Sequence, residues 1–148
     1  MTISITKASK KEIPFILELL YELERPKPKN DKEIEIFKNK IKDYFSDPQK
    51  TIFLAKQDAH IVGMVSIIFL NRLNQTKNEM YIPELIVSKK FRNLGIGKKI
   101  MQFCGEFAKR EDCYRIRLES GNQRKKSHEF YINIGFEQNS LSFSKNIL

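Results

Sequence analysis

Apolar and polar residues follow two different periods along this chain, and the succession of these periods predicts a mixed α/β fold. Alternation of apolar and polar positions is typical of strands, whereas apolar residues three or four positions apart indicate helices. Strands are expected over residues 3–7, 51–57, 61–70, 80–87, 114–118 and 141–147. Helices are expected from residue 9 to a break at 25–29, from 30 or 31 to 47, from the turn at 92–98 to about 110, and around 131.

Capping residues and prolines mark where the first two helices begin and end. Ser9 and Glu12 have the spacing of a capping box, which satisfies the unpaired N–H groups of a first helical turn. The Arg-Pro-Lys-Pro-Lys segment at 25–29 breaks this helix, because proline lacks a backbone N–H group. Asn30 or Asp31 then caps the second helix.

Length and composition favour a single domain over residues 1–148. Hydrophobic residues make up 41% of the chain, enough for a buried core at this length. There is no apolar run of membrane-spanning length and no signal-peptide pattern near the start, so we expect a cytoplasmic protein that does not enter a membrane. Cys104 and Cys113 have no His or Cys nearby at metal-ligand spacing, and no metal is expected.

The net charge of +9 raises the question of a nucleic-acid partner. The lysines are scattered over the polar faces of the expected helices, and the basic–aromatic interleaving of nucleic-acid modules is missing. Solvated faces and attraction for a polyanionic cofactor explain the charge, so the sequence does not favour a nucleic-acid partner.

A glycine-bearing turn follows the apolar run at 81–87 and opens a helix. The turn reads Arg92-Asn93-Leu94-Gly95-Ile96-Gly97-Lys98. Unpaired backbone N–H groups at a helix start attract anions, and the glycines let a phosphate approach closely. The turn lacks the spacing of a P-loop, and Ile100 occupies the third glycine position of a dinucleotide-binding fingerprint. A flexible turn without a ligand remains the alternative interpretation.

The turn resembles the R-x-x-G-x-G motif of the GNAT acetyltransferases. A second motif of that family, F-Y-x-x-x-G-F, is matched by residues 130–136. The resemblance implies a GNAT fold, a mixed sheet of six or seven strands with helices on both faces. It also implies that the turn binds the pyrophosphate of acetyl-CoA, with pantetheine along the backbone of Leu85, Ile86 and Val87. The strands ending at Val87 and Leu118 would splay apart to admit this arm.

The resemblance also implies an acyl transfer to an amine, assisted by an acid and a base. Tyr131 is the candidate acid for the departing thiolate, and a core aromatic residue is the alternative reading. Glu84 is the candidate base, with Glu79 or solvent as rivals and a surface glutamate as the alternative. Strand parity decides whether Glu84 reaches the site, and a bulge would change that parity. Arg124 departs from the family pattern, so no contact is assigned to it.

The acceptor cannot be read from the sequence. The resemblance implies that the first two helices, the loop between them at 22–31 and the loop at 71–78 select it, and neither loop contains a recognition motif. A small-molecule or peptide amine is expected, and a homodimer is open. Two other functions remain: a non-catalytic acyl-CoA sensor and a basic nucleic-acid module.

Overall fold

The structure is a computed structural model that describes residues 2–23 and 25–148, and the chain divides into two compact units. The larger unit comprises residues 1–117 and the smaller one residues 118–148. In chain order the elements of the larger unit are β1 (Ile3–Lys7), the 3₁₀ turn η1 (Lys10–Glu12), α1 (Ile13–Tyr21), α2 (Asp31–Ser46), β2 (Lys50–Gln57), β3 (His60–Leu70), β4 (Glu79–Ile82), β5 (Leu85–Val87), the 3₁₀ turn η2 (Lys89–Phe91), α3 (Ile96–Arg110) and β6 (Arg115–Leu118), whose last residue begins the smaller unit. The smaller unit contains α4 (Lys125–Asn133).

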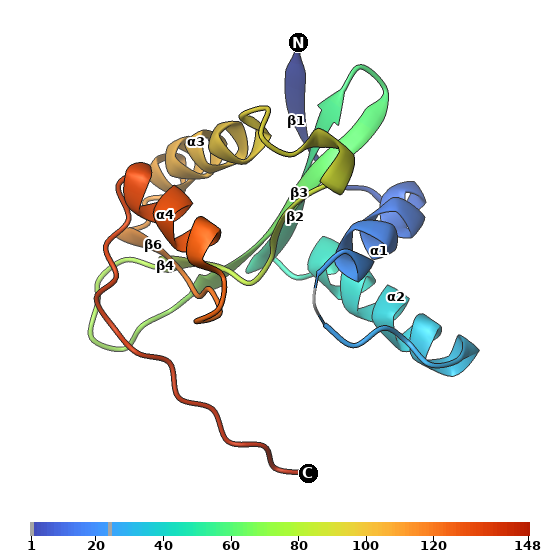
Figure 1. The fold of residues 1–148 in the computed structure, drawn as a ribbon. Helices are drawn as coiled ribbons and strands as arrows, with labels where there is room; N and C mark the ends of the chain where they lie inside the picture. Colours follow the sequence, from blue (N-terminus) through green and yellow to red (C-terminus); the bar gives the residue numbers. More distant parts are fainter. Residues whose placement is uncertain (1, 24) are drawn as a thin grey trace. The chain divides into compact units, whose positions relative to one another are not determined.

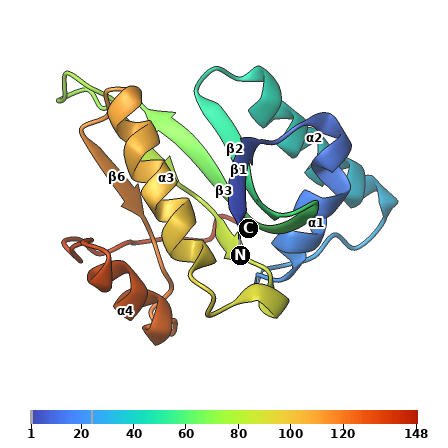
Figure 2. The same ribbon diagram turned by 90° about the horizontal axis from the view of Figure 1, so that it is seen from above.

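The sheet of the larger unit has six strands. Five of them follow the order β1-β2-β3-β4-β6. The sixth, β5, pairs with β3 at residues 63–65, whereas β4 pairs with β3 at residues 68–70. The β1–β2, β2–β3, β3–β4 and β3–β5 pairs are all antiparallel. Helices α1 and α2 lie on one face of this sheet and α3 lies on the other (Figures 1 and 2). The predicted mixed α/β fold with helices on both faces is therefore confirmed.

Each face of the sheet has its own apolar layer. Ile52, Leu54 and Met64 pack with the buried side chains of α1 on the α1/α2 face. Aromatic rings fill the α3 face, where Phe53 lies 4.7 Å from Phe103 between ring centroids. The alternating strands and the helical stripes read from the sequence account for both layers.

The predicted helix caps are present. Ser9 donates its backbone N–H to a carboxylate oxygen of Glu12 at 3.0 Å, as a capping box requires, and η1 precedes α1. Asn30 accepts from the N–H of Glu33 at 2.9 Å and is the N-cap of α2. The first helix proper ends at Tyr21, and the expected extension to residue 24 reaches a position outside the described residues.

The terminal strand expected over 141–147 is wrong, because the described residues after α4 contain no strand. Leu141, Phe143 and Ile147 are 77%, 89% and 87% exposed. Alternation of apolar residues suits a strand, but a strand also needs a neighbouring backbone with which to pair. Residues 141–147 have no such pairing with any described segment.

Candidate active site

The turn between β5 and α3 has the backbone geometry of an anion site. Asn93 and Gly95 adopt left-handed conformations, with φ of 64° and 80°. Gly95 is the N-cap of α3 and has no side chain that could cap the helix. The first N–H groups of the helix therefore have no side-chain acceptor from the N-cap. Arg92 folds back to donate from Nε to the carbonyl of Val87 at 3.2 Å. The predicted turn and helix start are confirmed as structure.

The charges in the first turn of α3 also favour an anionic ligand. Helix starts usually carry acidic residues, which the helix dipole stabilises. The first turn of α3 has none, and the exposed Lys98 and Lys99 occupy it instead. Positive side chains beside the positive end of the dipole repel it, and an anion bound there would relieve this repulsion.

Strand β5, which leads to the turn, is paired on one side only within the described residues. It pairs with β3, whereas β6 pairs with β4. The backbone of Leu85, Ile86 and Val87 therefore has an edge without a strand, as the predicted splay requires. Such an edge can accept an extended ligand through backbone hydrogen bonds.

A bulge divides the strand that the sequence predicts over 80–87. In β4, Tyr81 lies opposite Ile68, whereas in β5 Ile86 lies opposite Met64. The pairing register thus changes by one residue at the Pro83–Glu84 step, where one extra residue is inserted. Proline contributes no N–H to the ladder, which suits this interruption.

The bulge determines which face Glu84 occupies. Glu79 and Tyr81 lie opposite Leu70 and Ile68, on the α1/α2 face of the sheet. Without the extra residue, strict alternation would direct Glu84 to the α3 face. The bulge instead places Glu84 beside Ser66, on the face it shares with Glu79.

Within the part of the chain that the structure describes, Glu84 has few charge-stabilising partners. The Ser66 hydroxyl donates to Glu84 Oε1 at 3.1 Å, and Arg25 Nη1 lies 3.8 Å from Oε2. The Glu84 N–H donates to Ser66 Oγ at 2.9 Å, which fixes the backbone at the bulge. The side chain is only 17% exposed, and burial raises the pKa of Glu84 above its usual range despite Ser66 and Arg25. A partly buried carboxyl with a raised pKa is a better proton acceptor than an exposed one.

Glu79, the rival base, has a different environment. Its side chain has no exposed surface and accepts hydrogen bonds from Arg117 Nε at 2.9 Å, from Arg115 Nε, and from the Tyr114 hydroxyl at 3.2 Å. Burial alone would raise the pKa of Glu79, but Arg117 and Arg115 outweigh burial and hold the pKa below its usual range. A carboxylate so stabilised is a weak base.

Tyr44, in α2, is a neighbour of Glu84 that the sequence did not single out as a site residue. Burial and the nearby charges of Glu84 and Tyr81 raise the pKa of the Tyr44 phenol to about 12, so the phenol stays protonated. Tyr44 belongs to the apolar stripe of its helix, which is why it reads as a core residue. Ser66 and Arg25 were also missed, because their role depends on tertiary contacts rather than on a local motif.

In the smaller unit, Tyr131 lies in α4 within an aromatic cluster. Its ring centroid is 5.2 Å from that of Phe130 and 5.6 Å from that of Phe136. Burial raises the pKa of Tyr131, and the charge of Arg124 partly opposes this shift. His128 Nε2, in α4, lies 2.8 Å from the carbonyl oxygen of Gly121, in the loop before this helix.

The larger unit thus brings together the turn, the open edge of β5 and Glu84, which the sequence named separately. Among the described residues no cluster of three or more His, Cys, Asp or Glu side chains could hold a metal ion. No described helix is long and apolar enough to cross a membrane.

Comparisons with known proteins assign the chain to one family. A family model described as "Acetyltransferase (GNAT) family" matches residues 17–136. The chain is 26% identical over 117 residues to the aminoalkylphosphonate N-acetyltransferase of Salmonella typhimurium, covering 79% of this chain and 76% of that protein. It is 24% identical over 130 residues to the glucosamine 6-phosphate N-acetyltransferase of Arabidopsis thaliana, covering 87% and 85%. A solved structure described as a transcriptional regulator from Bacillus halodurans C-125 has a TM-score of 0.85 at 21% identity, covers 99% of this chain and 100% of that one, and shows the likeness of fold.

Proposed function

Because this chain belongs to the GNAT acetyltransferase family, and is therefore an N-acetyltransferase, we propose that it transfers an acetyl group from acetyl-CoA directly to the primary amine of an acceptor. The observation that carries this proposal is the position of Glu84. Its carboxyl group, with a raised pKa, precedes β5, the strand that leads into the anion-binding turn.

Acetyl-CoA would be held by the backbone of two adjoining segments. The pyrophosphate would accept hydrogen bonds from the first N–H groups of α3, with Arg92 and Lys98 adding charge-assisted contacts. Pantetheine would pair with the open edge of β5. A backbone N–H group of β5 would also polarise the thioester carbonyl, which requires no particular side chain.

The reaction needs a neutral amine, and Glu84 would supply it. An alkyl amine is only about 10⁻³ to 10⁻⁴ neutral at pH 7. Glu84 would take the proton, directly or through one water, as the nitrogen bonds to the carbonyl carbon of the thioester. The C–S bond then breaks and the electron pair leaves with sulfur as thiolate.

Tyr131 is the proposed acid for the departing thiolate. The raised pKa of its phenol keeps the proton on oxygen at neutral pH, so that it remains available for transfer. Because the family match runs from residue 17 to residue 136, across the boundary of the two units, we treat the chain as one functional domain. The named substrates of the two relatives are amines, and a small-molecule or peptide amine is the proposed acceptor class here.

The proposed assembly is a homodimer formed through residues 141–147. Their apolar alternation and exposure suit a strand that pairs with the sheet edge of a second copy. Light scattering on the full chain, compared with a chain ending at residue 138, checks this. A full chain of monomer mass would contradict it.

A thiol-release assay with acetyl-CoA and a panel of primary amines tests the proposed function. Release of CoA should depend on the amine, and mass spectrometry should find the acetylated product. Binding of acetyl-CoA by calorimetry, without release for any amine, would instead support an acyl-CoA sensor.

A matched pair of glycine variants in α3 tests the cofactor site. Gly97→Val should weaken acetyl-CoA binding severely, because its side chain would obstruct the pyrophosphate. The control is Gly105→Val in the same helix, where an added Cβ meets nothing within 4 Å. Equal affinity in both variants would contradict the assignment of the turn.

A further inference from the structure

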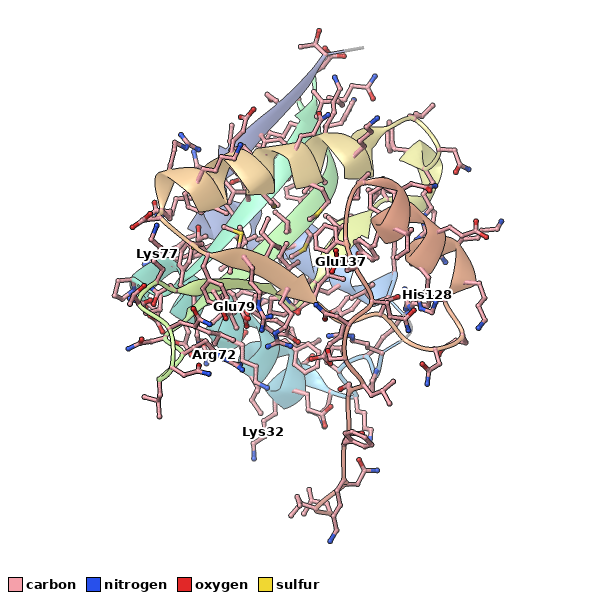
Figure 3. All side chains as sticks on the ribbon, turned by 90° about the vertical axis from the view of Figure 1, so that its left-hand side faces the viewer. Lys32, Arg72, Lys77, Glu79, His128 and Glu137 are labelled. Carbon is pink, nitrogen blue, oxygen red and sulfur yellow. The ribbon has the colours of Figure 1, made fainter. Side chains whose placement is uncertain are left out.

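Three arginine side chains surround the buried carboxylate of Glu79. Arg117 and Arg115 donate to it from Nε, and Arg72 Nη1 lies 4.0 Å from Oε1. Figure 3 shows Glu79 beside β6 and Arg72 on the loop that precedes β4. One guanidinium balances one carboxylate, and Arg117 is the least exposed of the three. Among the described residues the cluster around Glu79 thus has a surplus of positive charge, and Arg115 and Arg72, whose side chains are 42% and 45% exposed, are open to a ligand.

The surplus charge lies on the same face of the sheet as Glu84. Arg117 stacks over the Tyr81 ring at 4.6 Å, and Tyr81 shares the face of Glu79. The bulge places Glu84 on that face as well. Glu79 and Glu84 are five positions apart on the extended chain, which separates them by roughly 15 Å. Since arginine side chains are long, the guanidinium groups can approach closer to Glu84 than this.

A purely structural role explains only part of this arrangement. Neutralising Glu79 requires one cation, and each further guanidinium repels the first. An incoming anion would remove that repulsion. Arginine suits oxyanions especially well, because its planar fork forms paired hydrogen bonds with phosphate-like groups.

We infer that the acceptor amine carries a phosphate- or phosphonate-type oxyanion, which binds Arg115 and Arg72 while the amine lies at Glu84. This inference rests on the proposed function, because it assigns the second end of the molecule that is acetylated. The separation along the strand favours an acceptor with a spacer of several bonds between the amine and the anion, rather than a very short one.

A homologous series of acceptors tests the inference. Aminoalkyl phosphonates with chains of two to six carbons are compared with n-alkylamines and α,ω-diamines of the same lengths. The phosphonates should have the largest kcat/KM, mainly through a lower KM, and the diamines the smallest, because their second ammonium group meets surplus positive charge.

Charge-neutral variants localise the effect. Arg115→Gln and Arg72→Gln should each lower kcat/KM for the phosphonates about 10- to 100-fold, the range of a lost charge-assisted hydrogen bond. The same variants should leave kcat/KM for the n-alkylamines within about twofold. Lys77→Gln is the matched control, because Lys77 lies in the same loop as Arg72 but pairs with Asp112 at 2.9 Å. The contact of Arg72 with Glu79 is long, at 4.0 Å, so Arg72→Gln should disturb the fold less than Arg115→Gln and provides a second test if Arg115→Gln misfolds.

Two results would overturn the inference and leave the proposed function intact. One is an equal kcat/KM for phosphonates and n-alkylamines. The other is an equal loss of kcat/KM for both acceptor classes in the arginine variants. If no amine is acetylated, the proposed function fails, and calorimetry with the aminoalkyl phosphonates still decides about the anion site. Binding that is lost in Arg115→Gln would support the site, and absence of binding to the wild-type protein would overturn it.

Discussion

Glu79 and Glu84 lie on one face of the sheet, close together in sequence, yet their acidities shift in opposite directions. Glu79 has no exposed surface, and its pKa is lowered. Glu84 is 17% exposed, and its pKa is raised. The more buried carboxylate is thus the stronger acid, so burial alone does not decide which group holds a proton.

The difference comes from the donors around each carboxylate. Glu79 receives hydrogen bonds from two guanidinium groups and a phenol, which stabilise its charge. Among the described residues, Glu84 accepts a side-chain hydrogen bond from the Ser66 hydroxyl, and its cationic partner Arg25 lies 3.8 Å away and is 59% exposed. The segment from β4 to β5 therefore holds one carboxylate whose charge is well stabilised and one whose charge is not.

The largest expected effect follows from removing the proposed base. Glu84→Gln should lower kcat by roughly 10²- to 10⁴-fold near neutral pH, the range for loss of a general base. Raising the pH should restore part of the rate, because more of the acceptor is then already neutral. A rate–pH profile with the preferred amine measures this, with the exposed Glu18→Gln as control. Wild-type rates for Glu84→Gln at every pH would remove Glu84 from the mechanism.

Removing the structural carboxylate should instead reduce stability. Glu79→Gln leaves the arginines without their common anion, and a loss of about 2–4 kcal/mol is expected, less than for a fully buried pair because the arginines are partly exposed. Urea unfolding measures this difference. A variant as stable as the wild-type protein, with its acetylation rate abolished, would exchange the two roles.

The pH dependence of stability should differ in sign between the two residues. Because the folded-state pKa of Glu79 is lowered, its contribution is present above the ordinary carboxyl range and is lost as the pH falls through the folded-state pKa. The raised pKa of Glu84 means that its charged form destabilises the fold at neutral pH, and that this penalty disappears as the pH falls through the raised pKa. The free energy of unfolding of Glu79→Gln should be lower than that of the wild type at neutral pH, and this difference should shrink on acidification. Any excess in the free energy of unfolding of Glu84→Gln over the wild type should shrink on acidification as well. Unfolding free energies from pH 4 to 8 check both trends, and parallel curves for all three proteins would contradict them.

The smallest expected effect concerns Ser66. Ser66→Ala removes the hydroxyl that stabilises the Glu84 carboxylate, so the pKa of Glu84 should rise further and the acid limb of the rate–pH profile should move to higher pH. Rates well above that limb should stay near wild type. The exposed Ser46→Ala serves as control. An unmoved acid limb would show that Ser66 only supports the bulge.

The sequence predicted the features that depend on neighbouring residues. The glycine spacing at 92–98 gave the turn and the start of α3, because a left-handed Gly95 and a helix N-terminus are local properties. The capping residues of η1 and α2 were recognised for the same reason.

Features that depend on pairing across the sheet were not predictable. Pro83 was visible in the sequence, but the bulge beside it exists only relative to β3, and this bulge decides the side of Glu84. The alternation at 141–147 predicted a strand whose partner no local pattern could supply. Glu79 was named only as a rival base, since its arginines come from β6 and from the loop before β4.

The contacts of Glu79 also bear on how the chain reaches its native alignment. Arg115 and Arg117 are two positions apart in β6, and both meet the same carboxylate of β4. A slip of β6 by one residue would turn both arginines toward the α3 face and place Ile116 beside Glu79. That misaligned form would enclose an unbalanced charge and two displaced cations, at a penalty of several kcal/mol. A single carboxylate thus discriminates between correct and shifted strand pairing as the chain folds.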